Sequence, residues 1–334
     1  MAARDVIISA FATPPESKYR TVVQNMSWFD EAPLVINVEP DMKAGEVLAS
    51  AGFQRTADKY FQRGAGSILG PLLAERAKGT EVRSVTLIGF SAGNSFLSRV
   101  LATKDWQNID GVISLDGMAF AQKDWIGDGA FISQSVDPWL RFATSAAQNK
   151  RLFVDAYTHI ASHGGTVGST ALSADHLIAS IVANLGGKSP FPLPIETADL
   201  VDFGATFPVT QTAHRPKAGG GSTLIERTWP SMPEPKRVGI GNAWFLDYGG
   251  KTEVDHIFIA RYAQAAIWKT FLAPRLNGGE MCAFPMSGLG AVCNSNRALL
   301  PPGTYPTPSA WPPRVALLAG VALGVAIHSV VIGD

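Results

Sequence analysis

The chain has 334 residues, enough for two domains of ordinary size or for one enlarged α/β domain with appended segments. Its 28 Lys and Arg balance 28 Asp and Glu, and charged residues make up only 17% of the chain, which argues against a nucleic-acid-binding protein. Apolar residues make up 46%, so the chain can bury a large core and is not disordered as a whole.

Short runs of β-forming residues are spread along the chain. Most of them are apolar at successive positions, which is typical of strands covered on both faces. The predicted strands are 5–11, 34–39, 82–89, 111–116, 151–157 and 243–248.

Segments with helical spacing of apolar residues fall between these strands, at 64–78, 92–103, 137–148, 173–185 and 256–272. Asp137 followed by Pro138 is typical of an N-cap with proline at the first helical position, and Asp255 is a candidate cap for the last helix. The alternation of strands and helices predicts an α/β fold with a doubly wound, mainly parallel sheet flanked by helices.

Prolines are concentrated in two stretches, 187–236 and 274–313, which are therefore expected to be loops or loosely structured excursions. The first is interpreted as an insertion or lid within a domain spanning 1–273. The second is a Pro-rich extension that holds both cysteines, Cys282 and Cys293, as a disulfide or as free thiols.

The chain ends in an apolar tail, 314–334. Within it, 315–333 contains no charged residue, and as a helix it would reach about 28 Å, close to the thickness of a bilayer core. The tail is a candidate membrane anchor or assembly contact; the alternative is a segment packed on its own protein. The N-terminus shows no cleavable secretory signal.

The sharpest motif is Gly89-Phe90-Ser91-Ala92-Gly93. It follows an apolar predicted strand and opens a predicted helix, which is the context that a nucleophile elbow needs to hold a serine in a strained turn with its hydroxyl exposed. The helix N-terminus also favours a developing oxyanion.

On this motif and the order of its elements, the chain resembles the α/β-hydrolase superfamily, in particular its compact cutinase-like or lipase/esterase-like members. The resemblance covers about 4–272. It implies that Ser91 is the nucleophile, followed along the chain by an acid and then a histidine.

The candidate base is His256, which follows the last predicted strand and begins the last predicted helix. His159 and His163 come before that strand and fit the expected order less well. Their spacing of four residues does not continue into a zinc-protease motif, and no metal site is expected.

Three carboxylates are candidates for the acid. Asp116 ends the strand after the elbow, at the same edge of the sheet as Ser91, and is the first choice. Asp155 in the next strand is the alternative, although it lies within an apolar run. Asp247 is closer to His256 in sequence but is expected to belong to a turn.

The oxyanion hole requires two backbone donors. The amide of Ala92, the residue after the nucleophile, is the first. The second is expected from the loop after the first strand, at Ala12 or Thr13. That loop lacks the glycine-rich pattern of some esterases.

These features predict a serine hydrolase that acts on a small-molecule or polymer carboxylic ester through an acyl-enzyme, without a cofactor. No phosphate-binding or dinucleotide-binding glycine motif is present in the sequence. The alternative hypothesis is a hydrolase-fold structural or binding component of a membrane or viral assembly, attached through its C-terminal region.

Overall fold

The computed structural model describes residues 3–11, 29–44, 49–61, 66–119, 135–148, 151–160, 170–185, 191–192, 207–216 and 221–277. The described residues do not include Cys282, Cys293 or the apolar tail. The hypothesis of a membrane or viral assembly component depends on these segments. Across the described ranges, every helix is too short or too polar to cross a bilayer.

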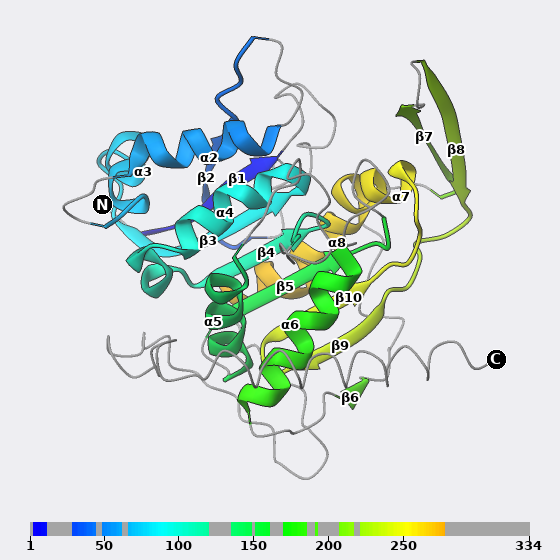
Figure 1. Ribbon diagram of the computed structural model, residues 1–334. Helices are drawn as coiled ribbons and strands as arrows, with labels where there is room; N and C mark the ends of the chain where they lie inside the picture. The colour runs from blue at the N-terminus through cyan, green and yellow to red at the C-terminus, as the bar shows by residue number, and fades with distance from the viewer. Residues whose placement is uncertain are drawn as a thin grey trace.

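Among the described residues, an eight-stranded and mainly parallel sheet lies at the centre of the fold (Figure 1). Its parallel strands lie side by side in the order β2 (Leu34–Val38), β1 (Arg4–Phe11), β3 (Val82–Phe90), β4 (Gly111–Leu115), β5 (Leu152–Tyr157) and β10 (Ala243–Asp247). Next come β9 (Lys236–Ile240), antiparallel to β10, and the short β6 (Phe191–Pro192).

The predicted α/β fold with a mainly parallel sheet is confirmed. Each of the six predicted strands is present with its ends within one residue of the expected positions. β4 and β5 are buried at every position, as their continuous apolar runs indicate. Strand order reverses between β1 and β3, and ligands of open α/β sheets bind at such a switch point, beyond the carboxyl ends of the strands.

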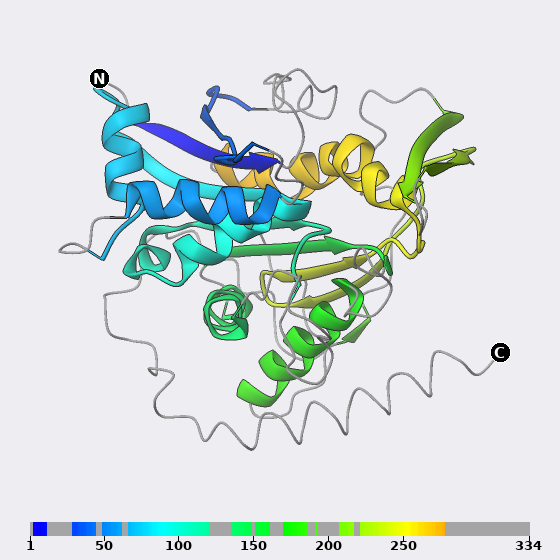
Figure 2. The same cartoon turned by 45° about the horizontal axis from the view of Figure 1, so that its top comes forward.

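Helices cover both faces of the sheet (Figure 2). Alternate residues of β1 divide between two cores: Val6 and Ile8 join one, and Ile7 and Phe11 join the other. The first core is covered by α2 (Ala49–Tyr60), α3 (Leu69–Arg76), α4 (Asn94–Leu101), α5 (Val136–Ala147) and α6 (Thr170–Asn184).

The second core is covered by a continuous helix over 253–276, called the long helix below. It consists of α7 (Glu253–Phe258), a π-helical turn (Ile259–Ala263), α8 (Gln264–Ile267), a second π-helical turn (Trp268–Leu272) and α9 (Ala273–Leu276).

Helix boundaries and caps differ from the sequence-based expectation. α2 was not expected, because only a few apolar residues, Phe53 and Ala57 among them, form its buried face. Asp137 lies inside the first turn of α5, whose N-cap is Ser135. The long helix is capped by Thr252, with Asp255 as the acidic partner of a capping box rather than the cap itself.

The Pro-rich stretch 187–236 contains regular structure, contrary to the prediction of loops. β7 (Val209–Pro216) and β8 (Ser222–Trp229) form an antiparallel hairpin, called the β7–β8 hairpin below, which projects beside the long helix (Figure 1). Pro208 and Pro230 flank the hairpin, and Pro216 ends its first strand. At strand ends the missing proline N–H removes no bond from the middle of the ladder.

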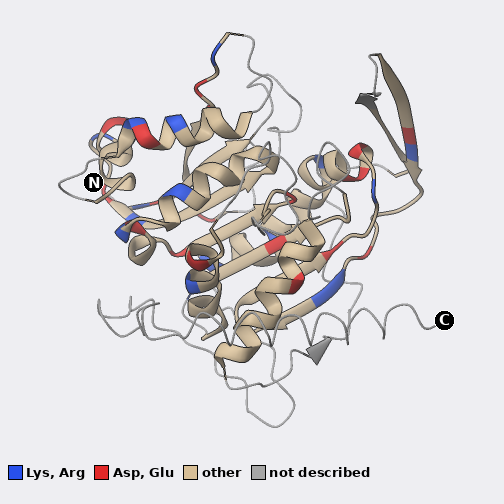
Figure 3. Cartoon of the chain, in the orientation of Figure 1, with Lys and Arg blue, Asp and Glu red and all other residues tan. Residues whose placement is uncertain are grey.

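Charged residues are sparse on the central strands of the sheet and are more frequent on the helices (Figure 3). β4 has none, and β5 has a single one, Asp155. The near absence of charge on β4 and β5 fits strands that are covered on both faces.

Candidate active site

Ser91 lies in a sharp turn between β3 and α4. β3 ends at Phe90, residues Ser91–Gly93 form one 3-10 turn, and α4 begins at Asn94. Ser91 has a φ of 54°, in the left-handed region that non-glycine residues rarely adopt. The strand, turn and helix expected around the motif are thus present, and the serine backbone is strained.

Close packing of the backbone surrounds this turn. A Cβ atom on Gly93 would lie 1.8 Å from the carbonyl oxygen of Ala10 in β1. One on Gly117, after β4, would lie 2.1 Å from the carbonyl oxygen of Ser91. At Gly89 the closest atoms would be 3.0 Å away and belong to side chains, a tighter contact than usual. Glycine is therefore required at Gly93 and Gly117, and the second of these was not identified from the sequence.

Asp116 and His256 meet at the carboxyl edge of the sheet, the edge at which Ser91 also lies. Asp116 directly follows β4 and has a φ of 44°, and His256 lies in the first turns of the long helix. Nδ1 of His256 is 2.8 Å from Oδ2 of Asp116. The structure thus joins the first-choice acid to the candidate base across 140 residues of sequence.

Hydrogen bonds from Thr158 and Thr170 surround the Asp116 carboxylate. The backbone N–H of Thr158 donates to Oδ1 at 2.9 Å, and its hydroxyl donates to Oδ2 at 2.6 Å. The Thr170 hydroxyl lies 2.6 Å from Oδ1. Burial by itself raises the pKa of Asp116, but the hydrogen bond and charge of His256, with the two threonines, outweigh it and lower the pKa below the ordinary value.

The two threonines were not identified from the sequence. Thr158 follows the predicted strand 151–157 directly, so its position at the carboxyl end of a strand was an available signal. Thr170 is the first residue of α6 and lies 54 residues from Asp116, and no local pattern links the two.

The His256 ring stacks on the side chain of Phe90, the residue before Ser91. The ring centroids are 4.7 Å apart and the ring planes are inclined by 29°. Since an ionised carboxylate only accepts hydrogen bonds, Nδ1 carries the proton that it donates to Asp116, and Nε2 is left as the basic nitrogen. Two contacts therefore orient the imidazole: Asp116 binds its Nδ1, and Phe90 at the end of β3 stacks on its ring face.

Asp155, the alternative acid, has a different environment. It lies inside β5, where burial and the nearby charge of Asp116 raise its pKa to about 8 and its carboxylate oxygens have no hydrogen-bond partner among the described residues. Asp155 is thus mainly protonated at neutral pH. A neutral carboxyl group cannot stabilise an imidazolium as a carboxylate does, which favours Asp116 as the acid.

Asp247 and His159 form a separate pair at the same edge of the sheet. Nε2 of His159 lies 2.9 Å from Oδ1 of Asp247, and this hydrogen bond raises the pKa of His159. Oδ1 of Asp247 also accepts the N–H of Gly249, as expected for a turn residue. His163 lies outside the described residues. Over the described ranges, no group of three or more His, Cys, Asp or Glu residues is arranged to hold a metal ion.

Only part of the expected oxyanion hole lies in the described ranges. Ala92 is half-buried in the turn that leads into α4, where the amides of a helix N-terminus favour negative charge. Ala12 and Thr13 lie outside the described residues.

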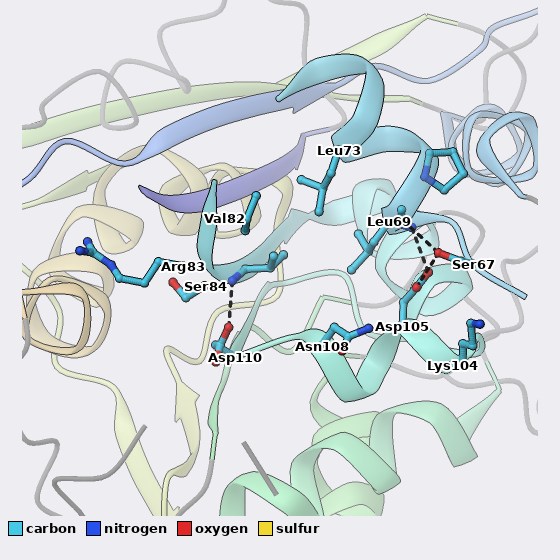
Figure 4. A pocket seen from close by; sticks show the side chains of 13 residues that line it. Ser67, Leu69, Leu73, Val82, Arg83, Ser84, Lys104, Asp105, Asn108 and Asp110 are labelled. Atoms are coloured by element: carbon cyan, nitrogen blue, oxygen red, sulfur yellow. Dashed lines mark hydrogen bonds between the residues drawn. The ribbon is translucent and has the colours of Figure 1, made fainter. Parts of the chain in front are cut away.

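A cavity of about 520 Å³ opens at the opposite edge of the sheet, near the start of β3 (Figure 4). Ser84 in its wall precedes Ser91 by seven residues of β3, a distance of about 23 Å. Its two acidic residues hold the fold itself: Asp105 accepts from Ser67 and from the Ile68 N–H, and Asp110 accepts from the Val85 N–H. This cavity is separate from the Ser91 site.

A comparison with protein-family models found no match, and a comparison with curated proteins found no significant match.

We predict that Asp155→Asn stabilises the protein increasingly as pH rises. In the wild type the pKa of Asp155 is about 8 in the folded state and about 4 in the unfolded state. The free energy of unfolding is therefore highest below pH 4 and falls progressively as pH rises to 8. Between pH 4 and pH 7 the advantage of Asp155→Asn should grow by roughly 3–4 kcal/mol. Urea denaturation across this range measures it. The exposed Asp30→Asn is the control, and equal pH slopes for Asp155→Asn and the wild type would contradict the prediction.

Thr170→Val should weaken the hydrogen-bonding environment of Asp116. Loss of the hydroxyl should cost about 1–2 kcal/mol at pH 7, because a buried carboxylate loses a donor. The lowered pKa of Asp116 contributes stability above its unfolded value that disappears as pH falls through the folded value. In Thr170→Val the folded pKa of Asp116 should lie closer to the unfolded value, so the loss of stability with acid in urea denaturation should be smaller and should be complete at a higher pH. Thr212→Val, at an exposed position of β7, should behave as the wild type, and identical acid limbs for Thr170→Val and the wild type would refute the prediction.

Proposed function

We propose that this protein is a serine hydrolase of the α/β-hydrolase type that cleaves carboxylic esters through an acyl-enzyme on Ser91. The observation that supports it most is the hydrogen bond between His256 and the ionised Asp116, with the His256 ring stacked on the residue next to the strained Ser91. The chain order serine, aspartate, histidine supports the same assignment.

In this proposal, His256 activates the nucleophile. Nε2 of His256 accepts the proton of the Ser91 hydroxyl while Oγ forms a bond to the ester carbonyl carbon. The carbonyl oxygen becomes an oxyanion, which the backbone N–H of Ala92 stabilises. Asp116 stays ionised and stabilises the imidazolium, since the hydrogen bond and charge of His256, together with the hydrogen bonds from the two threonines, keep its pKa low.

Collapse of this tetrahedral intermediate breaks the bond to the alcohol. His256 gives its proton to the departing alcohol oxygen, which leaves an ester between Ser91 and the acyl group. A water molecule then gives its proton to Nε2 and attacks the acyl carbon. The second collapse returns the proton to Ser91 and releases the carboxylic acid.

The carboxyl end of the sheet is a suitable place for this chemistry. The site lies where strand order reverses between β1 and β3. Phe90 stacks on His256 and directly precedes Ser91 in the chain. The neutral overall charge of the chain supports an uncharged ester as substrate, of small-molecule or polymer type.

The test is labelling by a fluorophosphonate probe together with hydrolysis of p-nitrophenyl butyrate. Wild-type protein should be labelled at Ser91, and Ser91→Ala should abolish both labelling and hydrolysis. Asp116→Asn and His256→Ala should lower kcat by about 10³-fold or more, because either change removes the oriented base. Ser98→Ala, in α4, serves as the matched serine control. Labelling that persists in Ser91→Ala would reject the mechanism.

A further inference from the structure

The loop that leads to His256 is organised around the carboxylate of its neighbour Asp255. Oδ2 of Asp255 accepts from the N–H groups of Lys251 and Thr252 at 3.1 and 3.0 Å, and from the Thr252 hydroxyl at 2.6 Å. Gly250 has a φ of 76°, and a Cβ there would lie 2.3 Å from Cγ of Asp255. The Asp255 side chain is only 6% exposed, so the loop wraps closely around a buried charge.

The other oxygen of Asp255 is bound from outside this loop. Nη1 of Arg227, in β8, donates to Oδ1. The guanidinium also lies over the Trp229 ring, 5.0 Å from its centroid. This planar group can pair with a carboxylate and stack on an aromatic ring at once, which a lysine ammonium cannot do in the same way.

The β7–β8 hairpin contacts one face of the long helix. Trp229 packs on Phe258 with ring centroids 4.5 Å apart, and Gln211 of β7 accepts from Arg261 at 2.8 Å. The helix residues in contact are therefore Asp255, Phe258 and Arg261, a spacing of three that places them along one side of the helix. His256 lies within this stretch and turns its ring toward Asp116 and Phe90.

The two partners of the Arg227–Asp255 ion pair differ in their exposure to solvent. Arg227 is 47% exposed, so its contribution to global stability is expected to be small. Asp255, in contrast, is buried and holds the backbone directly before His256. Loss of Arg227 would thus alter the arrangement of the loop more than the stability of the whole fold.

We propose that Arg227 is a positioning residue for His256, and that docking of the β7–β8 hairpin on the long helix sets the imidazole for catalysis at Ser91. The proposal rests on the proposed hydrolase function and deepens it. It assigns a specific action to the β7–β8 hairpin: the hairpin acts through the helix that bears the base, and Arg227 does not touch the substrate.

The test compares Arg227→Ala and Arg227→Lys with the wild type. Active sites are counted by fluorophosphonate labelling, and kcat and KM are measured with p-nitrophenyl butyrate. Arg227→Ala should lower kcat about ten- to a hundredfold with KM changed less than about twofold, because a misplaced base affects the chemical step. Arg227→Lys should recover part of the loss, since it restores the charge without the stacking.

The control is Arg99→Ala. Arg99 forms an ion pair with Asp58 at 2.9 Å, and its side chain is 49% exposed, which matches Arg227. Because this pair lies between α4 and α2, its removal should leave kcat unchanged.

A second measurement does not depend on activity. In protein with ¹⁵N-labelled histidine, the Nδ1–H signal of His256 reports its hydrogen bond to Asp116, and Arg227→Ala should shift this signal while Arg99→Ala should not. The proposal is overturned if Arg227→Ala lowers only the unfolding midpoint and keeps both the wild-type kcat and the wild-type His256 signal. If the wild type is not labelled at Ser91, the hydrolase function fails, and the His256 signal alone then decides whether Arg227 positions the ring.

Discussion

A buried charge must be satisfied by hydrogen bonds, and the site is arranged around one such charge, the carboxylate of Asp116. The donors come from separate parts of the fold: Thr158 after β5, Thr170 at the start of α6, and His256 in the long helix. None of these elements can shift without leaving the carboxylate short of a partner. The requirement therefore ties both layers of helices to the edge of the sheet where Ser91 lies.

Two aspartates in neighbouring strand regions show how environment determines chemistry. Asp116 and Asp155 are both buried, yet the pKa of Asp116 is lowered and that of Asp155 is raised to about 8. The difference lies in the donors: Asp116 lies just beyond its strand, where threonines and an imidazole reach it, whereas Asp155 lies within its strand among apolar residues. Only the first is suited to orient a base, and the second acts mainly as a pH-dependent cost to stability.

Layered support continues outward from the imidazole. Phe90 and Asp116 hold the ring directly, Asp255 organises the loop before it, and Arg227 connects that loop to the β7–β8 hairpin. Asp255 binds its own loop locally, whereas the contacts of His256 with Phe90 and Asp116 and that of Asp255 with Arg227 join residues distant in sequence. In the proposed arrangement, stacking, capping and ion pairing together hold the His256 side chain in place.

The sequence by itself determined the strands, the parallel sheet and the position of Ser91, because continuous apolar runs and a glycine-flanked serine between strand and helix are local patterns. It limited the candidate acids to a few aspartates and selected His256 as the candidate base by chain order. Tertiary structure decided what local patterns cannot contain: that Asp116 rather than Asp155 meets His256, that Thr170 and Gly117 complete the site, and that a Pro-rich stretch forms a hairpin. The physical reason is that hydrogen-bond partners, desolvation and backbone contacts depend on residues brought together from far apart in the chain.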